Sequence, residues 1–167
     1  MKNYKLTQEQ IKEIAENLDC GFRCFWSKTN GELLFFMNND DIFGEEDEEL
    51  DETEEENWDF SIEEKKKIRN DPDDYEEIRG LESYESFNIM EEFIDTLSDS
   101  NKLKNRLINA LAKRKPFSNF KYEIDNSGDY RQEWFDFKKN KMEEWVKERF
   151  KEIIEEIEFK EEREDEK

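Results

Sequence analysis

Histidine is absent from this sequence, and with it the commonest general base and the commonest metal ligand among protein side chains. Cysteine occurs only twice, as Cys20 and Cys24. On one regular strand these residues would lie about 13 Å apart, too far for a disulfide, and no second Cys or His pair is present to complete a zinc tetrahedron. We therefore expect two buried structural thiols, no metal site and no other cofactor.

Glycine is also scarce, with five residues, and neither Gly-x-x-x-x-Gly-Lys nor Gly-x-Gly-x-x-Gly is present to cradle a phosphate. The Gly-x-Ser-x-Gly motif of serine hydrolases is missing as well. No EF-hand register around Gly44 or Gly128 places a glutamate at the twelfth position. Because 48 acids make any carboxylate pair unremarkable, we expect a non-catalytic protein. An enzyme with a cryptic carboxylate site remains an alternative.

Long apolar runs are missing too. No stretch of about 20 apolar residues and no signal-peptide pattern occur, so we expect a cytoplasmic protein without a membrane partner. Charged residues make up 45% of the chain, which is typical of disorder or of long solvated helices. The 14 Phe, 5 Tyr and 4 Trp argue against disorder, because large aromatic side chains dominate protein cores. We therefore predict a small aromatic core with charged appendages.

The net charge of -21 is concentrated in two segments. Residues 29–64 hold 16 acids and no Lys or Arg, and residues 151–167 hold nine acids and four bases. The rest of the chain carries 23 residues of each sign. The sequence therefore predicts a neutral body with two acidic segments, which disfavour non-specific contact with nucleic acid.

Residue patterns predict the elements of an α+β fold. A capping box of Thr7 and Gln10 begins a helix that ends at residue 18, and strands at residues 22–27 and 33–37 flank an Asn-Gly turn. Residues 75–81 fit a strand or a coil. Helical periodicity or helix-start signals mark the remaining helices: residues 61–69, 85–97, 101–113 with Ser100 as the cap, 116–124 and 130–159.

These elements combine into a mostly helical α+β fold in which a small antiparallel hairpin or sheet packs against helices. We predict one domain over residues 1–159 with an acidic insertion at residues 40–56. Residues 160–167 are polar throughout and are expected to fray as an acidic tail.

Residues 101–122 carry seven Lys or Arg and no Asp or Glu. Basic residues interleaved with aromatics can hold phosphates and stack bases. The candidate binding residues are Lys113, Arg114, Lys115 and Lys121. We favour a plainer interpretation, in which Phe117 and Phe120 belong to the core and the cations are solvated. A third interpretation has residues 40–56 fold over the basic stretch and block it.

Three stretches of the chain share the order and spacing of a known family. Phe117, Phe120 and Lys121 are followed by Arg131 and by aromatics at positions 134, 135 and 137. Together with residues 26–33 and 90–93, this pattern resembles Uncharacterised Protein Family 0158, which is mostly bacterial and has no established activity. The resemblance covers residues 21–149, implies one domain and assigns no catalytic residue. The segment at residues 40–56 coincides with a region that varies within the family.

The charge layout predicts a regulatory or interaction protein whose acidic segments engage a basic protein partner. Mimicry of nucleic acid, with carboxylates in place of phosphates, is one form of this. The alternative is a nucleic-acid or phosphate-binding module that uses residues 102–121, and we favour nucleic acid less as a partner. The sequence indicates no oligomeric state.

Overall fold

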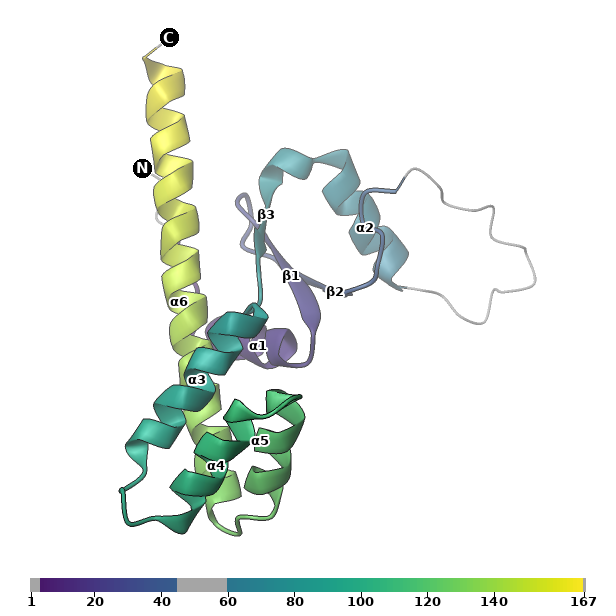
Figure 1. Cartoon of the computed structure of the whole chain (residues 1–167). Coiled ribbons are helices and arrows are strands. Elements are labelled where there is room, and N and C mark those ends of the chain that lie inside the picture. The colour runs from purple at the N-terminus through teal and green to yellow at the C-terminus, as the bar shows by residue number, and fades with distance from the viewer. Residues whose placement is uncertain (1–3, 45–59, 167) are drawn as a thin grey trace, which may run out of the picture. The chain divides into compact units, whose positions relative to one another are not determined.

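A computed structural model describes residues 4–44 and 60–166 of the chain (Figure 1). These residues form six α-helices, a short 3-10 helix and a three-stranded sheet, so the predicted α+β class with mostly helical content is confirmed. The chain divides into two compact units, Met1–Gly80 with Val146–Lys167 and Leu81–Trp145. The long helix α6, Tyr130–Asp165, contributes to both units. A single domain over residues 1–159 stays a prediction.

The first unit contains an antiparallel sheet with strand order β2-β1-β3. The predicted hairpin is confirmed as β1, Phe22–Ser27, paired with β2, Leu33–Met37. Its turn needs the glycine, because Gly31 has a φ of 74°. The segment whose sequence fits strand or coil becomes β3, Tyr75–Ile78, through its pairing with β1.

Helix α1, Gln8–Asp19, begins at the predicted capping box. The backbone amide of Gln10 donates to Thr7 Oγ1 at 3.1 Å, and the amide of Thr7 donates to Gln10 Oε1 at 3.0 Å. The apolar face of the helix is buried as its spacing indicates, with Ile14 fully buried. Gln10 also donates from Nε2 to the carbonyl oxygen of Gly31 at 3.2 Å, so this side chain joins α1 to the hairpin turn.

The expectation of two buried thiols is wrong for one of them. Cys24 lies within β1 and is fully buried, but Cys20 is the C-cap of α1 and is exposed. The helix ends there and Gly21 turns the chain with a φ of 87° before β1 begins, so the two cysteines do not share a strand. Both thiols are free.

The start of the expected acidic insertion packs into the first unit. Ile42 is 1% exposed and lies in one core cluster with Phe25, Leu34, Phe36 and Ile68. Arg69 donates from Nε to the Ile42 carbonyl oxygen at 2.7 Å. Helix α2, Phe60–Asn70, and the 3-10 helix η2, Pro72–Asp74, follow before β3. Residues 45–56, the rest of the insertion, lie outside the described residues. The interpretation in which the insertion folds over the basic stretch therefore stays a prediction.

The second unit is helical: α3, Ser83–Thr96; α4, Lys102–Ala112; α5, Pro116–Asp125; and the first part of α6. Trp134 lies among aromatic rings, with ring centroids 5.3 Å from Phe93 and 4.8 Å from Phe120. Phe120 is buried as predicted, whereas Phe117 is 43% exposed and contacts Phe87 edge-to-face at 6.4 Å. Placing Phe117 in the core was therefore wrong.

Two helix boundaries differ from the sequence prediction. Asn101, not Ser100, caps α4, because its Oδ1 accepts a hydrogen bond from the Leu103 amide at 2.9 Å. Helix α6 continues to Asp165 instead of ending at residue 159. Residues 160–165 contain no glycine or proline that would stop a helix, and Arg163 lies over the Phe159 ring at 5.5 Å. Fraying of residues 160–167 stays a prediction.

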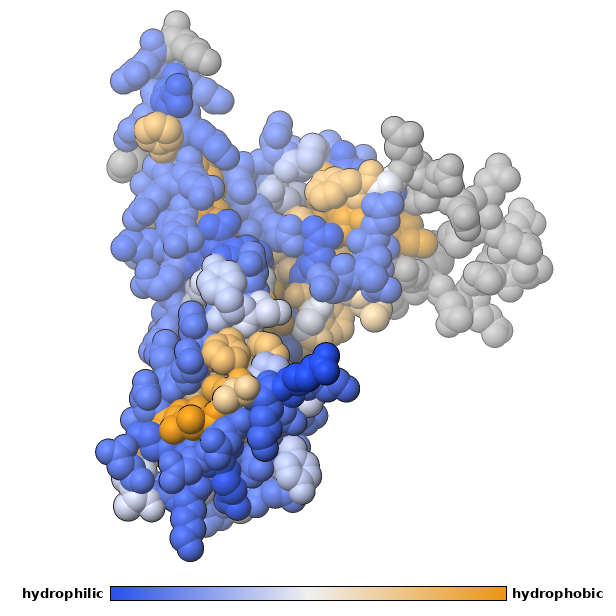
Figure 2. Space-filling model, in the orientation of Figure 1, coloured by the Kyte–Doolittle hydropathy of each residue, from blue (hydrophilic) through white to orange (hydrophobic). Residues whose placement is uncertain are grey.

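The visible face of the molecule is mostly hydrophilic, and hydrophobic side chains reach it in small patches (Figure 2). Over residues 4–44 and 60–166, no helix combines the length and the apolar character that a bilayer span requires.

Candidate functional site

The basic residues at positions 113–115 lie in a tight turn that joins α4 to α5. Lys115 adopts the left-handed conformation, with φ 57° and ψ 57°, which is uncommon for a residue other than glycine and more so before a proline. Asn119 holds the turn with two hydrogen bonds. Its side-chain Nδ2 donates to the Arg114 carbonyl oxygen at 2.8 Å, and its backbone amide donates to the Lys115 carbonyl oxygen at 3.1 Å. The three cations of this turn are exposed.

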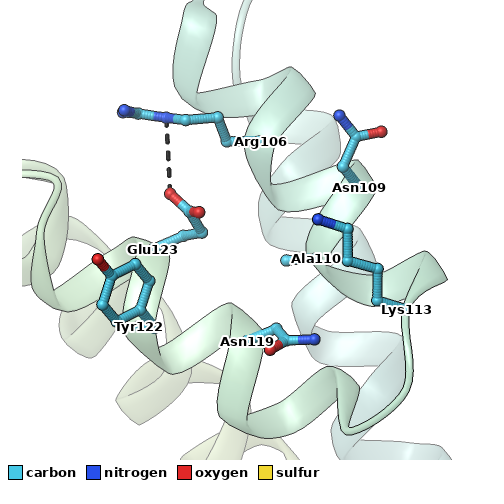
Figure 3. Close-up of a pocket in the computed structure, with 7 residues that line it drawn as sticks. All are labelled: Arg106, Asn109, Ala110, Lys113, Asn119, Tyr122 and Glu123. Atoms are coloured by element: carbon cyan, nitrogen blue, oxygen red, sulfur yellow. Dashed lines mark ion pairs between the residues drawn. The ribbon is translucent and has the colours of Figure 1, made fainter.

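A small pocket of about 180 Å³ lies between the two helices (Figure 3). Its α4 side consists of residues at positions 106, 109, 110 and 113, which share one helix face, and its α5 side of residues at positions 119, 122 and 123. The lining residues are Arg106, Asn109, Ala110, Lys113, Asn119, Tyr122 and Glu123. All but Ala110 carry a polar group.

Hydrogen-bond donors dominate this α4–α5 pocket. Arg106 and Lys113 bring positive charge, and the asparagine amides and the Tyr122 hydroxyl bring neutral donors. One acid is present: Glu123 Oε2 lies 3.6 Å from Arg106 Nε (Figure 3). The Arg106 side chain is 55% exposed, so this pair contributes little stability and an incoming anion can compete with Glu123 for the guanidinium.

The structure separates the four predicted binding residues. Lys113 lines the α4–α5 pocket, Arg114 and Lys115 lie in the adjoining turn, and Lys121 does not line it. Lys121 lies four residues after Phe117 and shares that flank of α5, whereas Tyr122 faces the pocket. All four side chains are exposed, and none forms an ion pair with a residue that the structure describes.

Of the seven lining residues, only Lys113 was among the candidate binding residues. The six that were missed are Arg106, Asn109, Ala110, Asn119, Tyr122 and Glu123. The spacing of positions 106, 109 and 113 on one helix face was a usable signal for the α4 side. The α5 side had no such signal, because it depends on how the turn orients the second helix against the first.

Comparison with known proteins assigns the family. Residues 6–166 match the uncharacterised protein family UPF0158. The chain belongs to this family. No curated protein and no solved structure matches it.

The first unit of this UPF0158 member has an acid-lined hollow of about 700 Å³ beside η2 and the C-terminal part of α6. Six of its lining residues are acids: Asp71, Asp73, Asp74, Glu76, Glu161 and Glu164. Two lysines also line it, and one of them, Lys28, pairs with Glu76 at 3.5 Å. The hollow is therefore a surface with a strong excess of negative charge.

Asp74 has a structural role at the edge of this hollow. Its carboxylate accepts hydrogen bonds from Ser27 Oγ at 2.5 Å and from the Thr29 amide at 2.8 Å. Partial burial raises the pKa of Asp74, but these hydrogen bonds outweigh burial and bring the pKa below its ordinary value. Asp74 thus joins η2 to the hairpin turn.

The cryptic carboxylate site of the enzyme hypothesis requires at least two buried acids in one pocket. Among the described residues, no Asp or Glu side chain is buried. The enzyme alternative stays a prediction.

Proposed function

We propose that this UPF0158 member is a non-catalytic binding protein whose α4–α5 pocket and adjoining turn hold phosphate groups. One observation carries the proposal. Lys113, Arg114, Lys115 and Lys121 are exposed and form no ion pair with a described residue, in a chain that holds 48 acids. Four other cations of the same unit do have acidic partners, as Lys104 has Asp99 at 2.9 Å. Exposed cations that lack an acidic partner among the described residues favour an external anion.

The chemistry of the pocket fits a phosphate. Arg106 and Lys113 supply charge-assisted donors, and the side-chain amide of Asn109 adds a neutral one. The Tyr122 side chain is 67% exposed, so its ring is free to stack on a base. A nucleic acid would use both the cations and the ring, whereas a small phosphate compound would use the cations alone.

The test compares polyanion binding by two charge-matched variants. The site variant changes Lys113, Arg114, Lys115 and Lys121 to Ala, and the control changes four other exposed lysines, Lys12, Lys66, Lys139 and Lys160. We expect the site variant to lose at least about tenfold in affinity for labelled single-stranded RNA at low salt, since each lost phosphate contact removes counterion release. The control should lose much less.

A Tyr122→Ala variant separates the two sources of phosphate. Weaker binding of RNA with unchanged binding of inorganic polyphosphate would identify a nucleic acid as the ligand class. Fluorescence anisotropy measures both. If the unmodified protein binds neither probe at low salt, the proposal is wrong.

A second candidate function is suggested by the charge of the first unit. Leu81–Trp145 contain 13 acids and 11 bases, so almost the whole net charge of -21 belongs to the other unit. The six acids that line the hollow carry part of this negative charge. We propose, as the alternative, that a basic protein partner docks on this unit, and that the protein acts in the bacterial cytoplasm.

This alternative predicts binding of polylysine that weakens steeply with salt, because the screening length falls to about 3 Å at 1 M. Changing Asp71, Asp73, Glu161 and Glu164 to their amides should weaken that binding. The matched control changes four acids of the second unit: Glu91, Asp95, Glu133 and Asp136. Equal effects of the two variants would show that net charge alone is responsible, and would contradict a docking site.

A further inference from the structure

A second hollow of the first unit is apolar at its floor. It measures about 410 Å³ and lies between the N-terminal segment of the described chain and the C-terminal part of α6. Its floor includes Tyr4, Leu6, Phe150 and Ile154. Three of them are only half-buried, so the hollow, which we call the Phe150–Ile154 groove, leaves apolar surface uncovered.

Trp26 packs against two residues of the floor of the Phe150–Ile154 groove. The Trp26 ring is 2% exposed and meets the Phe150 ring edge-to-face at 4.9 Å. It also meets the Tyr4 ring edge-to-face at 5.4 Å. Because a buried core ring sets the positions of two floor residues, the groove is preformed.

The rim of the groove on α6 changes sign along the helix. Lys147 and Lys151 line one half, and Glu155 and Glu158 line the other. All four fall on one helix face, and at 1.5 Å per residue they span about 16 Å. The Lys151–Glu155 pair is 3.9 Å long with both side chains about two-thirds exposed, so both charges remain available to a partner.

We propose that the Phe150–Ile154 groove docks an amphipathic helix of a partner protein, antiparallel to α6. The apolar face of that helix packs on Phe150 and Ile154, as helices pack in apolar grooves. Its N-terminal half carries basic residues opposite Glu155 and Glu158, and its C-terminal half carries acidic residues opposite the two lysines.

A second copy of the chain fits the groove less well. Each copy has a net charge of -21, and like net charges oppose association. A helix with balanced charges meets no such repulsion, and it matches both halves of the rim that α6 forms.

The test uses two synthetic helical peptides of about four turns with the same leucine stripe. One has lysines in its N-terminal half and glutamates in its C-terminal half, and the other has these charges exchanged. We expect the first to bind at least about tenfold more tightly by fluorescence anisotropy, because four matched rim pairs of modest strength add together. Ile154→Asp should abolish binding of both, with circular dichroism confirming that the variant is folded.

A charge-exchange variant of the protein keeps the test decisive if Ile154→Asp does not fold. It combines Lys147→Glu, Lys151→Glu, Glu155→Lys and Glu158→Lys at constant net charge, and it should reverse the peptide preference. Unchanged preference, or no binding of either peptide to the unmodified protein, overturns the proposal. A dimer in sedimentation velocity that Ile154→Asp dissociates would show that a second copy occupies the groove, and would also overturn it.

Discussion

At the scale of single residues, Asp74 shows how one carboxylate stabilises two distant segments. It accepts hydrogen bonds from Ser27, which is fully buried, and from the Thr29 amide, although 45 or more residues separate it from both. Without this carboxylate, the buried hydroxyl of Ser27 loses its acceptor. Such a loss costs about 1–3 kcal/mol of unfolding free energy.

Asp74→Asn is therefore expected to lower the free energy of unfolding at pH 7 by about 1–2 kcal/mol in urea denaturation. Because the folded pKa lies below the ordinary value, the charged form stabilises the fold above pH 4 or so. That contribution is lost as the pH falls through the folded pKa, so the difference between the two proteins should shrink in acid. Asp73→Asn, an exposed neighbour, is the control. An equal effect of both changes would contradict the assigned role.

The two cysteines should differ sharply in reactivity. Cys20 is exposed, whereas Cys24 is fully buried, and burial raises the pKa of its thiol. We expect a thiol reagent such as Ellman's reagent to modify one cysteine in the native protein and both in urea. Mass spectrometry of the labelled peptides identifies the modified residue. Rapid labelling of Cys24 under native conditions would contradict the structure.

At the scale of elements, helix α1 is attached to the sheet through Gln10. Its side chain closes the capping box with Thr7 and also donates to the Gly31 carbonyl in the hairpin turn. One side chain thus starts the helix and orients it against the hairpin. Helix caps contribute about 1 kcal/mol each.

Gln10→Ala should therefore lower the free energy of unfolding by about 1 kcal/mol or slightly more, measured by urea denaturation. Gln10→Glu keeps the acceptor for the Thr7 amide but loses the donor to the Gly31 carbonyl, so it should also lower stability. Gln8→Ala, at an exposed position of the same helix, should change stability little. Equal losses from Gln8→Ala and Gln10→Ala would exclude a special role for Gln10.

At the scale of the whole molecule, α6 supplies buried side chains to both units, such as Trp134 to one and Phe150 to the other. A continuous helix with core residues in each unit favours cooperative unfolding of the two. The expected single domain predicts this cooperativity, and independent units would lack it.

The labelling rate of Cys24 in the first unit can report destabilisation of the second. Leu107→Ala removes a fully buried side chain of the second unit, which costs about 2–5 kcal/mol. If the chain unfolds as one domain, this change should raise the labelling rate of Cys24 at least about tenfold. Ile108→Ala, at a position 46% exposed on the same helix, is the matched control. A labelling rate unaffected by Leu107→Ala would show that the units unfold independently.

Features that depend on neighbours in the chain were determined by the sequence itself. The capping box of α1, its buried face, the hairpin around Gly31 and the start of α5 at Pro116 all follow from residues a few positions apart. The charge layout, with a basic stretch in an acidic chain, is likewise a property of the sequence. Hydrogen bonds and side-chain periodicity within one helix or turn act over this short range, so local patterns suffice to predict them.

Tertiary structure alone decided features in which distant segments meet. Phe117 is exposed and Phe120 buried although both lie on one predicted helix face, because only the second reaches Trp134. The α4–α5 pocket brings residues 106 and 123 together through the angle between two helices. The Phe150–Ile154 groove brings residues 4–11 together with residues 147–158. Packing of separate elements sets these contacts, and a local sequence pattern carries no information about it.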